Sequence, residues 1–480
     1  MYSEVLAGAL PTTHRAMVIV RLRAGSAAGQ AAAEAEPTGG LSILDELDRA
    51  GRVRAVLPLT PAAAGPEGAG GAIAALSTTA QQGDLGAASI IRLTDDEDVA
   101  RLLPALNDHR DVEYASRVPA RWFASATPPA QAVEHRIAGL ESRIAGLEAA
   151  PQPSPVWNLQ KVLWDQAVRE LGTEEVGNVR VGVLDTGVDD QHPDLADRLA
   201  RYVHAGPSTS GQVVSDQDVV GHGTHVAGTI AARFNQAIGT RGICATRLSV
   251  WKIFDDVPDY IETRGVYWYL VDPVLYRRAL ADCAEQVDVV NLSIGGTEPP
   301  DPQESALFRV LGERGVTVVA AMGNERGLGS PTSYPAAIPG VVAVGATAPD
   351  DSVASFSNAG DYISVSAPGV AIWSTVPHYP GQVGFHADVR ADGQPERGAP
   401  VPREVNYAAL SGTSMSAPHV TAATTLLLAS SRQKRDPESV RYLLMASADH
   451  VGSMQGQVWN RDIGAGRLNL RRLILAGRHL

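Results

Sequence analysis

The chain has 480 residues, and this length favours two domains because a single hydrophobic core stops growing well below it. Hydrophobic residues form 44% of the chain and charged residues 19%, which is typical of a globular protein. The formal net charge of -13 argues against a nucleic-acid partner, whose phosphates require clustered Lys and Arg, and no apolar stretch is long enough to span a membrane.

The cysteines and the N-terminus bear on the cellular compartment. Cys244 and Cys283 are too few for a disulfide framework and lack the other ligands of a zinc site, so we interpret them as buried thiols, with one bridge as the alternative. The N-terminus has no basic segment followed by a long apolar run, so we expect no secretory signal. We therefore expect a cytoplasmic protein, or a secreted one if the true N-terminus lies upstream.

After an N-terminal tail, residues 1–15, residues 16–117 form the first predicted domain. Strands are expected at residues 16–23, 52–59, 89–94 and 111–116, and helices at 41–51 and 96–108. This β-α-β-β-α-β order predicts a small α+β domain with a ferredoxin-like sheet.

Residues 118–155 are predicted to connect the two domains through a helix and a proline-rich linker. Within residues 131–149, apolar side chains recur at heptad spacing, at Ile137, Leu140, Ile144 and Leu147. Two heptads are too few for a free coiled coil, so we expect this helix to pack on its own protein, with dimerisation through it as the alternative. Prolines at positions 151, 153 and 155 then mark the linker.

Residues 156–480 form the second predicted domain, in which continuously apolar runs alternate with helices. Apolar strands are expected within VRVGVLD, TRLSVWKIF, VDVVNLSI, VTVVAAMGN and GVVAVGATA. Such runs are typical of parallel strands that are covered on both faces, so we predict an α/β fold with a doubly wound, mostly parallel sheet. Ligands of such sheets bind beyond the carboxyl ends of the strands, where Asp185 and Asn324 lie.

Three motifs in this domain carry groups for nucleophilic catalysis. They are VLDTGVDD with Asp185, GHGTHVAGTIAA with His222, and LSGTSMSAPHVTAATTLLLA with Ser414. A serine-protease triad needs a hydroxyl nucleophile, an imidazole base and a carboxylate that orients the imidazole. Each residue alone is as readily a helix cap or a core residue, but here the three occur together. An aspartic protease would need a second Asp-Thr/Ser-Gly or a symmetric dimer, and the chain contains no second Asp-Thr-Gly.

Together these motifs resemble those of the subtilisin-like serine proteases, the subtilases, over roughly residues 157–475. The resemblance implies that Asp185 is the orienting acid, His222 the general base and Ser414 the nucleophile of a protease that hydrolyses polypeptides. It also implies that Asn324, in VVAAMGNERG, donates to the oxyanion. We expect a helix to start at Ser414 and to favour the developing anion through its positive end, with Pro418 within its first turn or so.

The resemblance further implies a set of substrate-binding residues. One strand would pair with an extended peptide and wall its first specificity pocket, and small residues would form another wall. These residues are Ser293, Ile294, Gly295, Gly296, Ala320, Ala321 and Gly323. Two segments depart from a compact family member. Residues 254–273 would line an outer pocket, bind a partner or pack as an ordinary loop, and residues 378–407 would be a lid or a surface loop.

The chemistry implied by the resemblance requires no cofactor. Subtilases often carry structural calcium, so Asp194 and Gln236 are candidate calcium ligands, although Gln stands where a stronger ligand is common. A calcium ion bound there would stabilise the fold and take no part in the reaction.

The first predicted domain, with its ending HRDVEYASRVPARWF, resembles the inhibitory propeptide domain that precedes many subtilases. The resemblance implies a folding chaperone that docks on the protease, leaves its tail in the active cleft and inhibits in cis until it is cut. We expect the cut between residues 115 and 156. Two alternatives stay open: an intracellular processing protease that retains this domain and waits for a partner, and a peptide-binding pseudoprotease.

Overall fold

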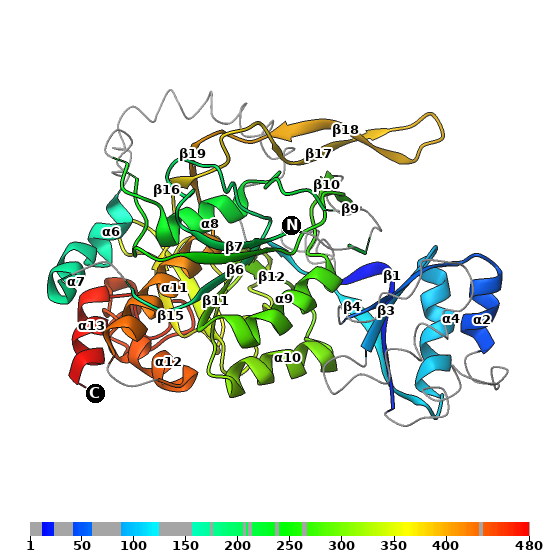
Figure 1. Cartoon of the computed structure of the whole chain (residues 1–480), viewed down its shortest axis with the longest axis horizontal. Helices are drawn as coiled ribbons and strands as arrows, with labels where there is room; N and C mark the ends of the chain where they lie inside the picture. Colours follow the sequence, from blue (N-terminus) through cyan, green and yellow to red (C-terminus); the bar gives the residue numbers. More distant parts are fainter. Residues whose placement is uncertain are drawn as a thin grey trace.

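The computed structural model describes residues 12–23, 42–59, 88–123, 156–172, 176–204, 208–209, 214–235, 240–261, 266–431 and 435–479. The predictions that fall on other residues concern most of the N-terminal tail, the 131–149 helix with its dimerisation, the proline-rich linker and the candidate ligand Gln236; they lie outside the described residues. In the described part, a small N-terminal domain lies beside a larger α/β domain (Figure 1).

The N-terminal domain is a four-stranded sheet covered by two helices. Its elements are β1 (Thr13–Leu22), α2 (Ser42–Arg49), β2 (Val53–Pro58), β3 (Ala88–Leu93), α4 (Asp96–Asn107) and β4 (Val112–Pro119). The strand order is β2-β3-β1-β4, with antiparallel pairing throughout. This arrangement confirms the predicted α+β domain and its ferredoxin-like order. Strand β1 begins at Thr13, somewhat before the predicted boundary at residue 16.

Alternate residues of β1 point to opposite faces of this sheet. Val18 and Val20 pack under the helices together with Leu44 of α2. Ile19, which lies between them, faces the other side and packs with Val274 of the α/β domain. The N-terminal domain is therefore docked on the larger domain through a hydrophobic face of its sheet.

The α/β domain is built on a seven-stranded sheet. Its strands are β6 (Val181–Asp185), β7 (Leu199–Val203), β8 (Leu248–Lys252), β11 (Val289–Leu292), β13 (Thr317–Ala321), β14 (Val342–Thr347) and β15 (Val365–Pro368). Their order is β15-β14-β13-β11-β6-β8-β7, and every pair is parallel. From β6 the chain first builds one edge with β7 and β8 and then the other from β11 to β15, which confirms the doubly wound prediction. The point where the direction switches lies beside β6, whose last residue is Asp185.

The strands of this sheet are covered on both faces, so apolar residues follow one another along them. Val183 contacts a core shared with α8 (His222–Ala231) and α11 (Thr413–Ser430). Its neighbour Leu184 contacts a second core, shared with α9 (Pro273–Gln286) and α10 (Pro302–Glu313). Each core also contains one cysteine, and both cysteines are buried free thiols, Cys244 and Cys283. The prediction of buried thiols is confirmed, and the alternative of a bridge is wrong.

The two predicted insertions form one additional antiparallel sheet. Its strands are β9 (Asp259–Ile261), β10 (Val266–Trp268), β17 (Gln382–Val389) and β18 (Pro395–Pro402), in the order β18-β17-β10-β9. Strands β17 and β18 form a hairpin that extends along the top of the domain in Figure 1. Residues 378–407 thus contain a hydrogen-bonded hairpin and not an irregular surface loop, and the β10–β17 pairing joins it to the aromatic segment 254–273.

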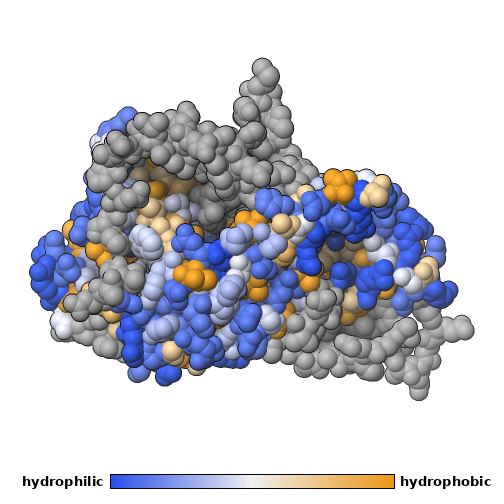
Figure 2. All heavy atoms as spheres, turned by 90° about the horizontal axis from the view of Figure 1, so that it is seen from above, coloured by the Kyte–Doolittle hydropathy of each residue, from blue (hydrophilic) through white to orange (hydrophobic). Residues whose placement is uncertain are grey.

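Further helices and strands surround these sheets. They are α6 (Trp157–Lys161), α7 (Trp164–Leu171), β16 (Ile372–Thr375), β19 (Tyr407–Leu410), α12 (Pro437–Ala446) and α13 (Leu470–His479). The described surface in Figure 2 is mostly hydrophilic, with hydrophobic side chains in small separate groups. Among the described residues, no helix is both long enough and apolar enough to cross a membrane.

Candidate active site

Asp185 and His222 form a buried hydrogen-bonded pair. Asp185 ends β6 and His222 begins α8, and the distance from Asp185 Oδ1 to His222 Nδ1 is 2.7 Å. The Thr186 backbone N–H donates to the same carboxylate oxygen at 2.7 Å. Gly223 permits the close approach of the two elements, since a Cβ there would lie 2.1 Å from the Gly187 carbonyl oxygen. The carboxylate thus favours the imidazole with a proton on Nδ1 and leaves Nε2 as the basic nitrogen.

Two further histidines in the same motifs have structural contacts. Burial lowers the pKa of His225 to about 3 and the pKa of His419 to about 4. A ring nitrogen of His225 lies 2.9 Å from the Ile372 carbonyl oxygen, and a ring nitrogen of His419 lies 2.7 Å from the Met415 carbonyl oxygen. Because both stay neutral near pH 7, neither competes with His222 for a proton.

Ser414 lies in the first turn of α11, which begins at Thr413 and not at Ser414 as predicted. Pro418 lies inside the helix, just past its first turn, and the sequence places it within the first turn or so. Because proline has no N–H, it cannot bond the Ser414 carbonyl four residues before it. The Ser293 hydroxyl donates to that carbonyl instead, at 2.8 Å. The proline thereby leaves the Ser414 carbonyl free to accept the hydrogen bond that links the first turn of α11 to Ser293.

The hydroxyl group of Ser414 also points to Ser293. Ser414 Oγ donates to the Ser293 carbonyl oxygen at 3.0 Å, and the Ser414 side chain is fully buried. Nε2 of His222 is buried as well and has no hydrogen-bond partner among the described residues. Helices α8 and α11, which carry the base and the hydroxyl, pack against each other. The base is therefore free, and the hydroxyl is held by a backbone carbonyl.

Asn324 follows β13, and Thr413 orients its amide. Asn324 Oδ1 accepts hydrogen bonds from the Thr413 backbone N–H at 2.9 Å and from the Thr413 hydroxyl at 3.1 Å. Since a backbone N–H can only donate, the amide oxygen is the atom that faces Thr413. The Nδ2 group is then left without a partner in the described part of the chain, although it is buried. A buried, unpaired amide donor next to the first turn of α11 is suited to stabilise an oxyanion.

The segment that follows the N-terminal domain lies against this site. β5 (Trp122–Phe123) pairs antiparallel with β12 (Ile294–Gly295). On the other side of the segment, the Val271 N–H donates to the Arg121 carbonyl oxygen at 2.9 Å. The segment is thus an extended strand held between two backbone segments of the α/β domain, as a bound peptide would be.

The Phe123 ring, at the end of this strand, lies beside the Asp185–His222 pair. Its centroid lies 5.1 Å from that of the His222 ring, and it stacks on Trp268 of β10, also at 5.1 Å. The side chain of Trp122, on the opposite side of the strand, packs with Ile261 and Leu270. The aromatic segment 254–273 therefore packs around β5, while its role in an outer substrate pocket stays a prediction.

The predicted substrate-binding residues around β12 lie at this strand pairing. Ile294 and Gly295 form β12, Ser293 precedes it and Gly296 follows it. A Cβ at Gly296 would lie 2.4 Å from the Ala120 carbonyl oxygen, so only glycine permits the segment to approach here. This strand is therefore placed as the sequence predicts, while its contact with a substrate stays a prediction.

The other three predicted substrate-binding residues lie at the end of β13. Ala320 packs in the core under α9 and α10, and Ala321 packs in the core under α8 and α11. Gly323 has a φ of +90°, and a Cβ there would lie 2.6 Å from Asn358 Nδ2. Ala320 and Ala321 are buried, and Gly323 has no room for a side chain; their role as a pocket wall stays a prediction.

The candidate metal ligand Asp194 is engaged by hydrogen-bond donors. Its Oδ2 accepts from the Tyr407 hydroxyl at 2.6 Å and from Asn235 Nδ2 at 3.4 Å. Burial, and after it the contact with Asp194, raises the pKa of Tyr407 to about 12, so the hydroxyl keeps its proton. In the part of the chain that the structure describes, no three His, Cys, Asp or Glu side chains are grouped to hold a metal. These contacts do not fit a cation at Asp194 Oδ2, and the second candidate, Gln236, lies outside the described residues.

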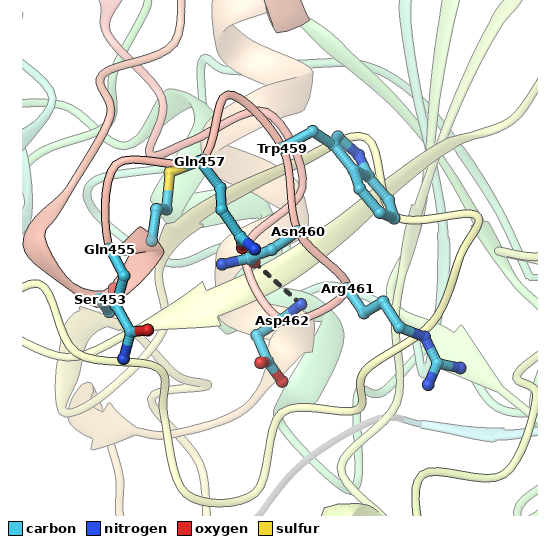
Figure 3. A pocket seen from close by; sticks show the side chains of 8 residues that line it. Ser453, Gln455, Gln457, Trp459, Asn460, Arg461 and Asp462 are labelled. Carbon is cyan, nitrogen blue, oxygen red and sulfur yellow. Dashed lines mark hydrogen bonds between the residues drawn. The ribbon is translucent and has the colours of Figure 1, made fainter.

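A surface pocket of about 410 Å³ lies in the loop of residues 453–462 (Figure 3). Trp459 and Arg461 are among its lining side chains, and Asn460 Oδ1 accepts from the Asp462 N–H at 3.1 Å. Its lining includes none of the predicted site residues, so we assign it no part in the chemistry.

Known proteins are similar to this chain in sequence and in fold. The sequence profile of the subtilase family matches residues 177–466. The chain belongs to the subtilase family. It is 33% identical to subtilisin of Bacillus pumilus over 280 residues, which cover 58% of this chain and 86% of that protein. It is 31% identical to the thermophilic serine proteinase of Bacillus sp. strain AK1 over 355 residues, which cover 74% of this chain and 71% of that protein.

A solved structure extends the similarity to the fold of nearly the whole chain. Fervidolysin from Fervidobacterium pennivorans, a keratinolytic enzyme related to subtilisin, aligns with a TM-score of 0.61 at 22% identity, over 97% of this chain and 61% of that one. The chain likewise spans 62% of the length of subtilisin E of Bacillus subtilis strain 168. The predicted family and the doubly wound fold are confirmed, and by family the subtilase is a serine-type endopeptidase that acts on polypeptides.

Three features of the site are not apparent from the motifs. They are the orientation of Asn324 by Thr413, the hydrogen bond from Ser293 to the Ser414 carbonyl, and the contact of Phe123 with the catalytic pair. The contact of Phe123 had a signal in the sequence, since an aromatic pair lies shortly after the final strand of the N-terminal domain. The second could have been found from Pro418, because a proline inside a helix always leaves one carbonyl free.

Proposed function

We propose that this subtilase uses Asp185, His222 and Ser414 as its catalytic triad, and that its N-terminal domain inhibits it in cis. The observation that carries the proposal is β5, which pairs with β12 as an extended substrate would. It also brings Phe123 into contact with the imidazole of His222. The enzyme would thus be made as a zymogen whose own chain occupies the place of the substrate.

The arrangement supports acyl transfer through a covalent intermediate. The Ser414 hydroxyl turns from the Ser293 carbonyl to Nε2 of His222, which takes its proton as Oγ attacks the substrate carbonyl. Asp185 stabilises the imidazolium that forms, and Asn324 Nδ2 and the positive end of α11 stabilise the oxyanion. His222 then protonates the leaving amine, and water releases the acyl group by the same route in reverse.

The orientation of the Ser414 hydroxyl supports a latent state. The hydroxyl donates its hydrogen bond to the Ser293 carbonyl and not to His222. At the same time β5 pairs with β12, the strand with which a substrate would have to pair. Phe123 is opposite Ile294, so one further step in the antiparallel register leads to Ser293, where the nucleophile is held. We therefore propose that self-cleavage breaks the peptide bond between residues 124 and 125, within the window expected from the sequence.

The test is the intact mass of the full-length protein before and after a fluorophosphonate probe. Wild type should lose its N-terminal part and gain one probe adduct, whereas Ser414→Ala should keep its full mass and gain none. Ser430→Ala, at the far end of the same helix, is the matched control and should behave as wild type. A wild-type chain of the same mass as Ser414→Ala would exclude self-processing.

The same experiment separates the two alternatives. A full-length wild-type chain that labels only after residues 1–150 are trimmed would indicate a retained domain that waits for a partner. A chain that does not label even after trimming would be a peptide-binding protein on a protease fold, and the triad assignment would then be wrong.

A further inference from the structure

A buried ion pair joins the segment beside the active site to the α/β domain. Arg121 and Glu304 are 2% and 1% exposed, and Arg121 Nη2 lies 3.0 Å from Glu304 Oε2. A second contact, from Arg121 Nε to Glu304 Oε1, measures 3.4 Å, and the Tyr276 hydroxyl donates to the same oxygen at 3.1 Å. The guanidinium and the carboxylate therefore face each other through two pairs of atoms, a geometry that lysine cannot reproduce.

The position of Arg121 relative to the catalytic pair is fixed by the strand. It lies two residues before Phe123, and alternate side chains of a strand share a face. Phe123 packs in the core under α9 and α10. Glu304 lies in the first turn of α10 and Tyr276 lies in α9, so Arg121 reaches the same face of the strand. The pocket around Glu304 is thus an outer subsite for a side chain two residues before the one that contacts His222.

Arg121 is the cation that donates hydrogen bonds to Glu304. The neighbouring carboxylate of Asp301 is hydrogen-bonded to Arg277, which also donates to the Pro273 carbonyl oxygen. Within the α/β domain, Glu304 receives its side-chain hydrogen bond from the neutral hydroxyl of Tyr276. Arg277 also attracts Glu304 electrostatically, whereas Arg121 meets its carboxylate directly in an ion pair. A buried carboxylate that loses its hydrogen-bonded cation is poorly compensated, so an arginine in the strand is preferred over an uncharged side chain.

We propose that Glu304 is a specificity-determining residue that selects polypeptides with arginine at the position that Arg121 occupies. The inference rests on the proposed function, because it treats the segment 120–123 as bound in the manner of a substrate. In the preferred sequence, arginine stands at the position of Arg121 and the residue that packs on His222 stands at the position of Phe123. The bond that is cut follows the next residue, as proposed for residues 124 and 125. Arginine is favoured over lysine because its planar group meets both carboxylate oxygens.

The test uses full-length protein and internally quenched peptides with the sequence of residues 118–128. The residue at position 121 is arginine, lysine or citrulline, the last of which keeps the shape of arginine without its charge. Fluorophosphonate titration of the labelled fraction gives the concentration of active sites. In wild type, kcat/KM should fall about 10- to 100-fold from arginine to citrulline, the range for hydrogen bonds to a charged partner. In Glu304→Gln the two peptides should be cut at nearly equal rates.

The control is Glu313→Gln, which removes the same charge from an exposed position at the other end of α10 and should keep the wild-type preference. If no chain is labelled by the probe, even after residues 1–150 are trimmed, the proposed function fails. If wild type is labelled but cuts none of the peptides, or cuts those with arginine and citrulline equally, the specificity inference is overturned while the triad stands. Wild type alone gives this answer, so it does not depend on the folding of Glu304→Gln.

Discussion

Acidification should loosen the docking of the N-terminal domain through His14. This residue of β1 is 6% exposed, and its ring hydrogen-bonds to the backbone of Val271 in the α/β domain. Burial, and after it the positive charges of Arg277 and Arg121, lowers the pKa of His14 from 6.5 to about 3. The docked state therefore binds the neutral imidazole, and a proton on His14 opposes docking.

The direction and size of the effect follow from proton linkage. In an undocked chain His14 has its ordinary pKa of 6.5, so the contribution of His14 to docking is complete above that pH and is lost progressively down to about pH 3. At pH 5, about 1.5 pH units below the pKa of the undocked His14, protonation shifts the docking equilibrium toward the undocked form. Relative to neutral pH the shift is about 2 kcal/mol, or roughly 30-fold in the docking equilibrium constant. Above pH 7 the same residue should have no effect.

Hydrogen exchange of the Val271 amide measures this equilibrium, because that amide donates across the docked segment to the Arg121 carbonyl. Full-length Ser414→Ala prevents self-cleavage during the measurement. After correction for intrinsic exchange, protection should fall about 30-fold between pH 7 and pH 5 and should fall much less in the double variant with His14→Gln. Equal pH dependence in the two proteins would refute the reasoning.

Three further outcomes are expected. Asn324→Ala should lower kcat about 10²–10³-fold with little change in KM for a chromogenic peptide, a magnitude taken from subtilisin and not from this geometry; an unchanged kcat would contradict the oxyanion role. Ser293→Ala should lower the free energy of unfolding in urea by about 1–2 kcal/mol, because the Ser414 carbonyl loses its donor; an unchanged midpoint would show that this bond contributes nothing. Trp268→Ala should raise KM about 3- to 10-fold for peptides with Phe at the position of Phe123, through loss of an aromatic contact, and should leave peptides with Ala there unaffected; an equal change for both would contradict direct stacking.

The strands and the triad motifs could be predicted because their signals are local. Continuously apolar runs identified the buried parallel strands, and Asp185 was placed at a strand end by the polar residues that follow. Strands β7 and β15, at the two edges of the sheet, were not predicted. β7 is partly exposed and carries polar residues, and β15 is buried but has Ser366 in place of a continuous apolar run. The hairpin β17–β18 was not predicted because its residues are largely exposed and its stability comes from backbone pairing with β10.

The contacts that complete the site could not be predicted because they join distant segments. Thr413 orients Asn324 across 89 residues of sequence, and Arg121 meets Glu304 across 183. Neither pair has a pattern that marks it, since an arginine after a strand and a glutamate in the first turn of a helix are each ordinary surface residues. Only the fold, which docks the N-terminal domain on α9 and α10, buries the second pair.

Under the proposed function, inhibition and substrate choice depend on the same group, Glu304. If Glu304 selects arginine in a substrate, the same carboxylate also retains Arg121 of the cleaved N-terminal segment, so a stronger preference for arginine means slower release of the inhibitor. Release must then come from another change at this interface, and protonation of His14 is such a change, because it adds a positive charge near Arg121 and leaves the Glu304 carboxylate in place. The two perturbations should therefore separate: Glu304→Gln should change both peptide preference and inhibitor retention, whereas His14→Gln should change only the pH dependence of retention.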